Sequence, residues 1–180
     1  LGDVYKRQVS TFVGAAPLND PNACMRDQDG DGYGDPSPLI GAPGTDCDDT
    51  EPLVHPGAAE FESLFDCMTD FDQDGYGEMN PAFGLSGTDC DDGDSDLTPA
   101  DVDSDGISTC EGDCNDLDSA TFPGAAEYNA PNACMTDADG DGFGSTTPSD
   151  GALIGTDCDD SNPFTYQGSA ELDSAIYCMT

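Results

Sequence analysis

Hydrophobic residues make up 36% of this 180-residue chain, much of that share is alanine and cysteine, and tryptophan is absent. Around the acidic stretches the sequence is rich in glycine and proline, and its apolar residues do not follow the spacing of an amphipathic helix. No apolar run approaches the roughly 18 residues that a membrane-spanning helix requires. We therefore expect a mostly irregular fold with short β-strands and without a single large core.

The acidic positions form a much more regular pattern. Asp-x-Asp-x-Asp-Gly occurs four times, beginning at Asp27, Asp70, Asp101 and Asp137. Carboxylates at alternate positions repel one another unless a hard cation lies among their oxygens. In a calcium loop, positions 1, 3 and 5 supply carboxylates, glycine at position 6 permits the turn, and position 7 supplies a backbone carbonyl. The ligands predicted in this way are Asp27, Asp29, Asp31 and Tyr33; Asp70, Asp72, Asp74 and Tyr76; Asp101, Asp103, Asp105 and Ile107; and Asp137, Asp139, Asp141 and Phe143.

A second acidic cluster follows each loop. These loops are not EF-hands, because position 12, where an EF-hand has a bidentate glutamate, is Pro38, Pro81, Gly112 or Pro148. Our hypothesis is that a disulfide holds the cluster so that it completes the preceding loop or binds a second Ca²⁺. The cluster residues are Asp46, Asp48 and Asp49 around Cys47; Asp89, Asp91 and Asp92 around Cys90; Asp113, Asn115 and Asp116 around Cys114; and Asp157, Asp159 and Asp160 around Cys158.

The charge balance limits the classes of partner. The chain has 39 Asp and Glu against 3 Lys and Arg, for a formal net charge of −36. A bare chain of this composition is expected to be expanded. A solvated acidic tail, however, consists of blocks of acids, whereas these acids recur at fixed offsets beside Gly, Cys and aromatic residues. Metal ions and disulfides are therefore expected to substitute for a core. The sign of the charge excludes nucleic acid as a partner.

The acidic loops belong to a repeat of roughly 44 residues. The repeat runs from Cys-Met through the Asp loop to Gly-Thr-Asp-Cys-Asp-Asp and, in the first repeat, on to Pro-Gly-Ala-Ala-Glu. We predict the end of a truncated repeat over 9–23, repeats over 24–66, 67–133 and 134–177, and the start of a cut-off repeat over 178–180. The second repeat carries an extra short calcium loop over 101–116.

The first eight residues differ from the rest in composition. They contain Lys6 and Arg7, two of the three basic residues of the chain. We expect residues 1–8 to be a non-native junction, and a short native strand is the alternative.

The nine cysteines indicate an oxidising compartment and hence a secreted protein. Pairing across each Asp loop joins Cys24–Cys47, Cys67–Cys90 and Cys134–Cys158, at separations of 23 or 24 residues, and leaves Cys110–Cys114 as a tight bridge and Cys178 alone. The other scheme has four equal separations of 20 residues, which favour it without proving connectivity. It joins Cys47–Cys67, Cys90–Cys110, Cys114–Cys134 and Cys158–Cys178, and leaves Cys24 unpaired or bonded outside the segment.

For the remaining candidate residues, the sequence favours a packing role over metal binding or catalysis. One methionine follows a cysteine in each repeat (Met25, Met68, Met135 and Met179), which favours a filler beside the disulfide over a Cu(I) site. His55 corresponds to the aromatic residues Phe122 and Tyr166, so we interpret it as a packing residue. A catalytic carboxylate pair is normally unique, whereas these pairs recur in every repeat, and there is no nucleophile–histidine–acid set. The sequence does not predict an enzyme.

The combination of Asp-x-Asp-Gly-Asp-Gly-Tyr-Gly, Asp-Cys-Asp-Asp and Pro-Gly-Ala-Ala-Glu resembles the MopE-type metal-binding motif repeats of secreted and surface proteins of bacteria. More distantly, it is similar to the calcium loops of thrombospondin type-3 repeats. The resemblance covers nearly all of the chain from residue 11 onward. It implies an extracellular, mostly irregular repeat array organised by Ca²⁺. The copper association of the family is not carried over, because copper needs imidazole or soft sulfur ligands and this chain has one histidine.

These observations predict an extracellular calcium-binding structural protein: a stalk, spacer or filament subunit. We expect an elongated rod that is stapled by disulfides and binds roughly four to eight Ca²⁺ ions. Its partners would be neighbouring repeats or identical chains joined head to tail. Thr146, Thr147 and Ser149 are candidate positions for O-linked glycans. The alternatives are metal sequestration or mineral nucleation, and an adhesin that presents a binding face.

Overall fold

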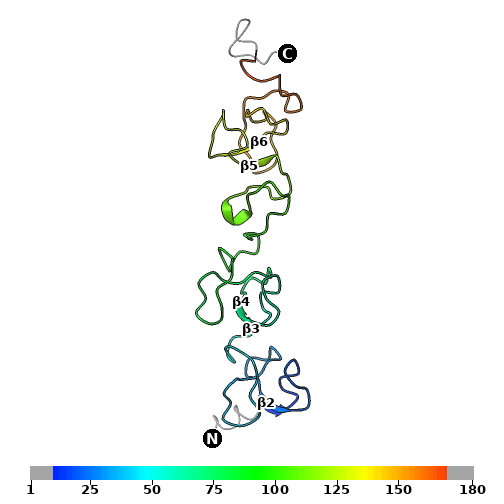
Figure 1. Ribbon diagram of the computed structural model, residues 1–180, viewed down its shortest axis with the longest axis vertical. Helices are drawn as coiled ribbons and strands as arrows, with labels where there is room; N and C mark the ends of the chain where they lie inside the picture. The colour runs from blue at the N-terminus through cyan, green and yellow to red at the C-terminus, as the bar shows by residue number, and fades with distance from the viewer. Residues whose placement is uncertain (1–9, 170–180) are drawn as a thin grey trace. The chain divides into compact units, whose positions relative to one another are not determined.

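A computed structural model describes residues 10–169 of the chain (Figure 1). The predicted junction over 1–8, the predicted repeat start over 178–180 and Cys178 lie outside the described residues. Residues up to Thr98 form one compact unit, and residues from Pro99 form a second. We call residues 24–66 the first segment, 67–98 the second segment, 101–116 the short loop and 134–169 the third segment.

The described part of the chain is mostly irregular, as predicted, with short strands in antiparallel pairs (Figure 1). Each strand has three residues. β1 (Thr11–Val13) pairs with β2 (Cys24–Arg26), β3 (Val54–Pro56) with β4 (Cys67–Thr69), and β5 (Thr121–Pro123) with β6 (Cys134–Thr136). One turn of 3₁₀-helix, η1, covers Thr109–Glu111 in the short loop. Within residues 10–169 no helix has the length and apolar character needed to cross a membrane.

A small apolar contact lies behind each strand pair. The methionine at the centre of β2, β4 and β6 is buried, with 3 to 4% of its surface exposed, and so is an alanine of the preceding turn. In the second segment, a Cβ added to Gly77 would lie 2.8 Å from Cε of Met68 and 3.2 Å from Cβ of Ala59. Methionine, alanine and glycine thus fill one small space together. The prediction that the methionines pack is confirmed for Met25, Met68 and Met135.

Few other apolar side chains are buried in the described residues, so the strands gain little from hydrophobic burial. A fully buried methionine contributes about 1.5–3 kcal/mol, which is small compared with the entropy of ordering some 40 residues at about 1–2 kcal/mol each. Interactions other than hydrophobic burial must therefore contribute much of the stability.

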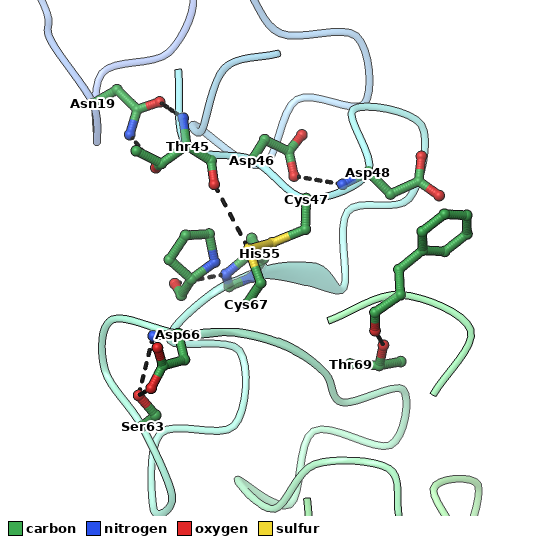
Figure 2. The surroundings of a disulfide bond; sticks show 12 residues. Asn19, Thr45, Asp46, Cys47, Asp48, His55, Ser63, Asp66, Cys67 and Thr69 are labelled. Atoms are coloured by element: carbon green, nitrogen blue, oxygen red, sulfur yellow. Dashed lines mark hydrogen bonds between the residues drawn. A yellow bond between two sulfur atoms is a disulfide. The ribbon is translucent and has the colours of Figure 1, made fainter. Parts of the chain in front are cut away.

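Disulfides supply part of that contribution, and two of the predicted pairs are confirmed. Cys47 is bonded to Cys67, and Cys114 to Cys134, each across 20 residues and with Cα atoms 6.0 and 6.3 Å apart. Figure 2 shows that the first of these bonds joins the acidic cluster to the beginning of β4. Cys90, Cys110 and Cys158 are also disulfide-bonded, and their pairing stays a prediction. Cys24 is a free, exposed thiol.

Candidate metal centres

All four Asp loops fold into the same turn, and the aspartate at position 1 organises it. In the first loop, Asp27 accepts hydrogen bonds from the backbone N–H of Gly30 at 2.6 Å and from that of Gly32 at 3.2 Å. The aspartates at position 1 of the other loops accept the same two bonds, from residues three and five positions later. Glycine is needed at position 6, because φ lies between 89° and 101° there in all four loops.

The aspartates at positions 3 and 5 each use one oxygen for the turn and leave the other free. Asp29 Oδ1 accepts the N–H of Asp31 at 3.2 Å, and Asp31 Oδ1 accepts the N–H of Tyr33 at 2.7 Å. The Oδ2 atoms of both side chains are buried and accept no hydrogen bond from the described residues. The same holds in the other three loops, for Asp72 and Asp74, Asp103 and Asp105, and Asp139 and Asp141.

The acidic cluster lies directly against the preceding loop. Its first aspartate is held by a backbone bond: the N–H of Asp46 donates to the carbonyl of Gly34 at 3.0 Å. Asp89 and Asp157 donate to the corresponding glycines at 3.0 and 2.8 Å, and Asp113 donates to Ser108 at 3.0 Å. The last aspartate of each cluster accepts the N–H of loop position 2 at 2.7 to 2.9 Å (Asp49, Asp92, Asp116 and Asp160).

This contact adds a third free oxygen to each loop. Asp46, Asp89, Asp113 and Asp157 are exposed by 2, 1, 7 and 0%, and the Oδ2 atom of each is buried without a hydrogen-bond partner among the described residues. Each of the four places therefore has three such oxygens, from loop positions 3 and 5 and from the first cluster aspartate. In all four places, the negative charges of two members of the trio raise the pKa of the third.

Burial and repulsion raise the pKa of these carboxyl groups. Loss of solvent and then the charges of Asp31 and Asp29 raise the pKa of Asp46 to about 7. Burial also raises the pKa of Asp31 to about 6. The pKa of Asp74, Asp105 and Asp141 is raised from the ordinary value, again chiefly by burial. As anions, these groups need a nearby positive charge.

The middle aspartates of the clusters do not join the trios. Asp91 and Asp159 are exposed, and Asp48 and Asp159 accept hydrogen bonds from the hydroxyl groups of Thr50 and Ser161. In Figure 2 the carboxylate of Asp48 is turned away from that of Asp46. None of their oxygens is buried without a partner. The structure therefore brings the predicted ligands Asp48, Asp91 and Asp159 near the loops but not among the converging oxygens.

The residue at loop position 7, predicted to supply a carbonyl ligand, also stabilises the turn through its N–H group. Its N–H donates to the aspartate at position 5 in all four loops. The Tyr33 ring stacks on His55, with ring centroids 5.0 Å apart, and Phe143 stacks on Tyr166 at 4.5 Å. His55 therefore packs on an aromatic ring, as predicted from its position in the repeat.

Sequence reasoning missed a side chain that joins loop and cluster. Asn19 Oδ1 accepts the N–H of Gly34 at 2.9 Å. It also accepts the N–H of Thr45 at 3.0 Å, and Asn19 Nδ2 donates to the hydroxyl of Thr45 (Figure 2). Asn129 makes the same three bonds to the third segment. Glu62 takes this place for the second segment, where it accepts hydrogen bonds from the N–H of Gly77 and the hydroxyl of Thr88. The signal was the asparagine shared by the matching stretches 11–27 and 121–137.

Three glycines allow the backbone of the cluster to approach the loop. A Cβ on Gly44 or Gly87 would lie 2.1 Å from a backbone carbonyl oxygen, that of Gly34 or Gly77, and a Cβ on Gly155 would lie 2.0 Å from that of Gly144. No side chain fits at that distance.

Comparison of the chain with models of protein families, with curated proteins and with solved structures found no match. The resemblance to MopE-type repeats therefore stays a prediction that rests on the motifs.

Proposed function

We propose that each Asp loop, together with the first aspartate of its cluster, binds one Ca²⁺ ion. The observation that carries the proposal is the trio of buried, unbonded carboxylate oxygens at each of the four places. A buried ionised oxygen without a partner is strongly unfavourable, and four equivalent trios are not expected by accident. The residues present fit a hard cation, which would take these oxygens and, at position 7, a backbone carbonyl.

The donor set favours Ca²⁺ over other metals. Every converging side chain is a carboxylate, which disfavours copper and zinc because these metals prefer imidazole or sulfur. Mg²⁺ retains several waters and is usually bound by one or two carboxylates, whereas Ca²⁺ takes six to eight oxygens in flexible geometry.

The biological role follows from the small cores and the disulfides. Disulfides persist in oxidising, extracellular-type environments, where calcium is present at millimolar concentration and modules with Kd of about 10⁻⁴–10⁻³ M are typical. We propose that the chain is part of a secreted structural protein, a stalk, spacer or filament subunit of stacked repeats, that Ca²⁺ stiffens into an elongated rod. This role agrees with the resemblance to surface repeats.

Calorimetric titration of the oxidised chain with Ca²⁺ tests the proposal. We expect at least about four saturable sites, with a more ordered circular dichroism spectrum and a stiffer, longer particle in small-angle scattering. Binding without saturation, or without a change in scattering, would indicate sequestration instead.

A matched pair of variants assigns the sites. Asp141→Asn retains the acceptor for the N–H of Phe143, at 2.9 Å in the native chain, but replaces the free oxygen by an amide nitrogen. Asp150→Asn removes the same charge from an exposed residue of the same segment. The first variant should lose one ion and the second none. Equal stoichiometry in the two variants contradicts the assignment.

A further inference from the structure

Arg26 is the one basic residue after position 8, and its guanidinium lies inside the acidic part of the first segment. Arg26 Nη1 is 2.5 Å from Asp35 Oδ2 and 2.8 Å from Asp49 Oδ2. Asp49 Oδ2 accepts no hydrogen bond from the described residues, and its contact with Arg26 is an ion pair. Two carboxylates that flank the loop are thus both paired with one cation that belongs to the chain.

The second segment has an acid at both corresponding positions, Glu78 for Asp35 and Asp92 for Asp49, but it has no such cation. Thr69 replaces Arg26, and the N–H of Glu78 donates to the carbonyl of Thr69, as the N–H of Asp35 does to that of Arg26. The Thr69 hydroxyl is directed elsewhere, to the carbonyl of Phe83 at 3.2 Å.

The carboxylates of the second segment surround a cavity. Glu78, Asp89, Asp91 and Asp92 line a space of about 370 Å³ together with Phe71, Met79 and Asn80. One oxygen each from Asp72, Asp89 and Asp92 lies within 4.8 Å of the others. The Oδ2 atoms of Asp89 and Asp92 are buried without a hydrogen-bond partner in the described structure, and Asp89 is 1% exposed.

In the third segment, the corresponding carboxylate needs no cation. Thr136 and Ser145 take the places of Arg26 and Asp35, and the Ser145 hydroxyl is hydrogen-bonded to Asp160, the counterpart of Asp49. One carboxylate is therefore absent there, and the other has a neutral donor.

We propose that the second segment binds an additional Ca²⁺ ion between Asp92, Asp89 and Glu78, at the place where the first segment has the Arg26 guanidinium. This inference rests on the proposed function, since Asp72 and Asp89 also belong to the loop site. It makes the segments unequal: the second holds two ions, and the first and third hold one each. Arg26 acts as a built-in substitute for a metal ion, and a single substitution exchanges one for the other.

Native mass spectrometry of the oxidised chain in Ca²⁺ counts the bound ions and tests this exchange. Arg26→Thr leaves Asp35 and Asp49 without their cation and should raise the count by one. Thr69→Arg should lower it by one. Ser86→Arg adds the same charge at an exposed position of the second segment and should leave the count unchanged.

A second pair of variants does not depend on fitting an arginine at the buried position 69. Asp92→Asn and Asp160→Asn each retain the acceptor for a loop N–H, at 2.8 Å in both segments. Only Asp92→Asn should lose an ion. Loss of one ion in both variants would overturn the inference, because the last cluster aspartate would then belong to the loop site in every segment. Loss in neither would also overturn it.

These outcomes differ from failure of the proposed function, in which the native chain itself binds no Ca²⁺ and the variants cannot change the count. That result would overturn both proposals together. A native chain that binds four ions, with the count unmoved by Arg26→Thr and Asp92→Asn, would overturn the additional site alone.

Discussion

Replacing Asp46 by asparagine should have opposite effects on stability with and without Ca²⁺. Asp46 is 2% exposed, and its Oδ1 accepts the N–H of Asp48 at 3.1 Å, a bond that asparagine can keep. Its Oδ2 is one of the three free oxygens of the first site. The variant therefore removes a charge and a proposed metal ligand while it preserves the turn.

The magnitude without Ca²⁺ follows from the pKa. Burial raises the pKa of Asp46 from 3.8 to about 7, which corresponds to about 4 kcal/mol at 1.36 kcal/mol per unit. This penalty is present in full above the folded pKa, shrinks as the pH falls through it, and is absent below the unfolded pKa. At pH 8 in a chelating buffer, Asp46→Asn should thus stabilise the first segment by up to about 4 kcal/mol. At pH 3, below the unfolded pKa of 3.8, it should have almost no effect.

Saturating Ca²⁺ reverses the sign. The ion compensates the charge of Asp46 in the native chain, so the variant loses a charged ligand and its first site should bind at least about tenfold more weakly.

Hydrogen–deuterium exchange of the first segment, followed by mass spectrometry, measures both effects on one sample. The amide of Asp46, which donates to Gly34, should exchange more slowly in the variant without Ca²⁺ and faster with it. Asp20→Asn, which removes a charge from an exposed residue, is the control and should change neither rate. The same direction of change in both buffers would refute the reasoning.

Three further predictions concern the scaffold and the protons. Gly87→Ala places a Cβ 2.1 Å from the carbonyl oxygen of Gly77, so it should cost at least about 1–3 kcal/mol; thermal unfolding in Ca²⁺ should show a loss that Ser86→Ala does not. Asn129→Ala removes three hydrogen bonds and should cost about 1–3 kcal/mol, with partial recovery in Asn129→Asp, which keeps the acceptor; equal stability of the two variants would contradict the role of the shared oxygen. Because Ca²⁺ requires ionised carboxylates whose pKa is raised in the free chain, binding should weaken from pH 7 to pH 5 and release protons; calorimetric enthalpies at pH 6 should differ between buffers of different ionisation enthalpy, and equal enthalpies would count against it.

Residues close together in sequence gave the most reliable predictions. The equal spacing of cysteines predicted Cys47–Cys67 and Cys114–Cys134. The alternation of aspartates picked out the two residues of each loop, at positions 3 and 5, that have a buried oxygen without a hydrogen bond from the described residues. Both patterns are visible because turn geometry dictates residue type at short range.

Contacts between residues far apart in the sequence were not predicted. Asn19 is hydrogen-bonded to Thr45 across 26 residues, and Glu62, a different type of side chain, is hydrogen-bonded to Thr88 across the same separation. Arg26 was conspicuous as a lone basic residue, but its partner Asp49 could be known only once the cluster was placed beside the loop. The middle cluster aspartates, such as Asp48, were predicted as ligands because they lie near the other ligands in sequence. In the structure their carboxylates point away from the converging oxygens.

The Cys47–Cys67 bond also decides how far the chain can be stretched. Twenty residues pulled straight would span about 70 Å, but the disulfide holds their ends at a Cα separation of 6.0 Å. A pulling force that arrives at Cys47 passes through the two sulfur atoms to Cys67 and leaves β3 and its turn without load. Each such bond therefore conceals roughly 65 Å of contour length, which only a reductant can release. The length that the chain can reach under tension therefore depends on its redox surroundings, whereas the proposed binding of Ca²⁺ by the acidic loops depends separately on calcium concentration and pH.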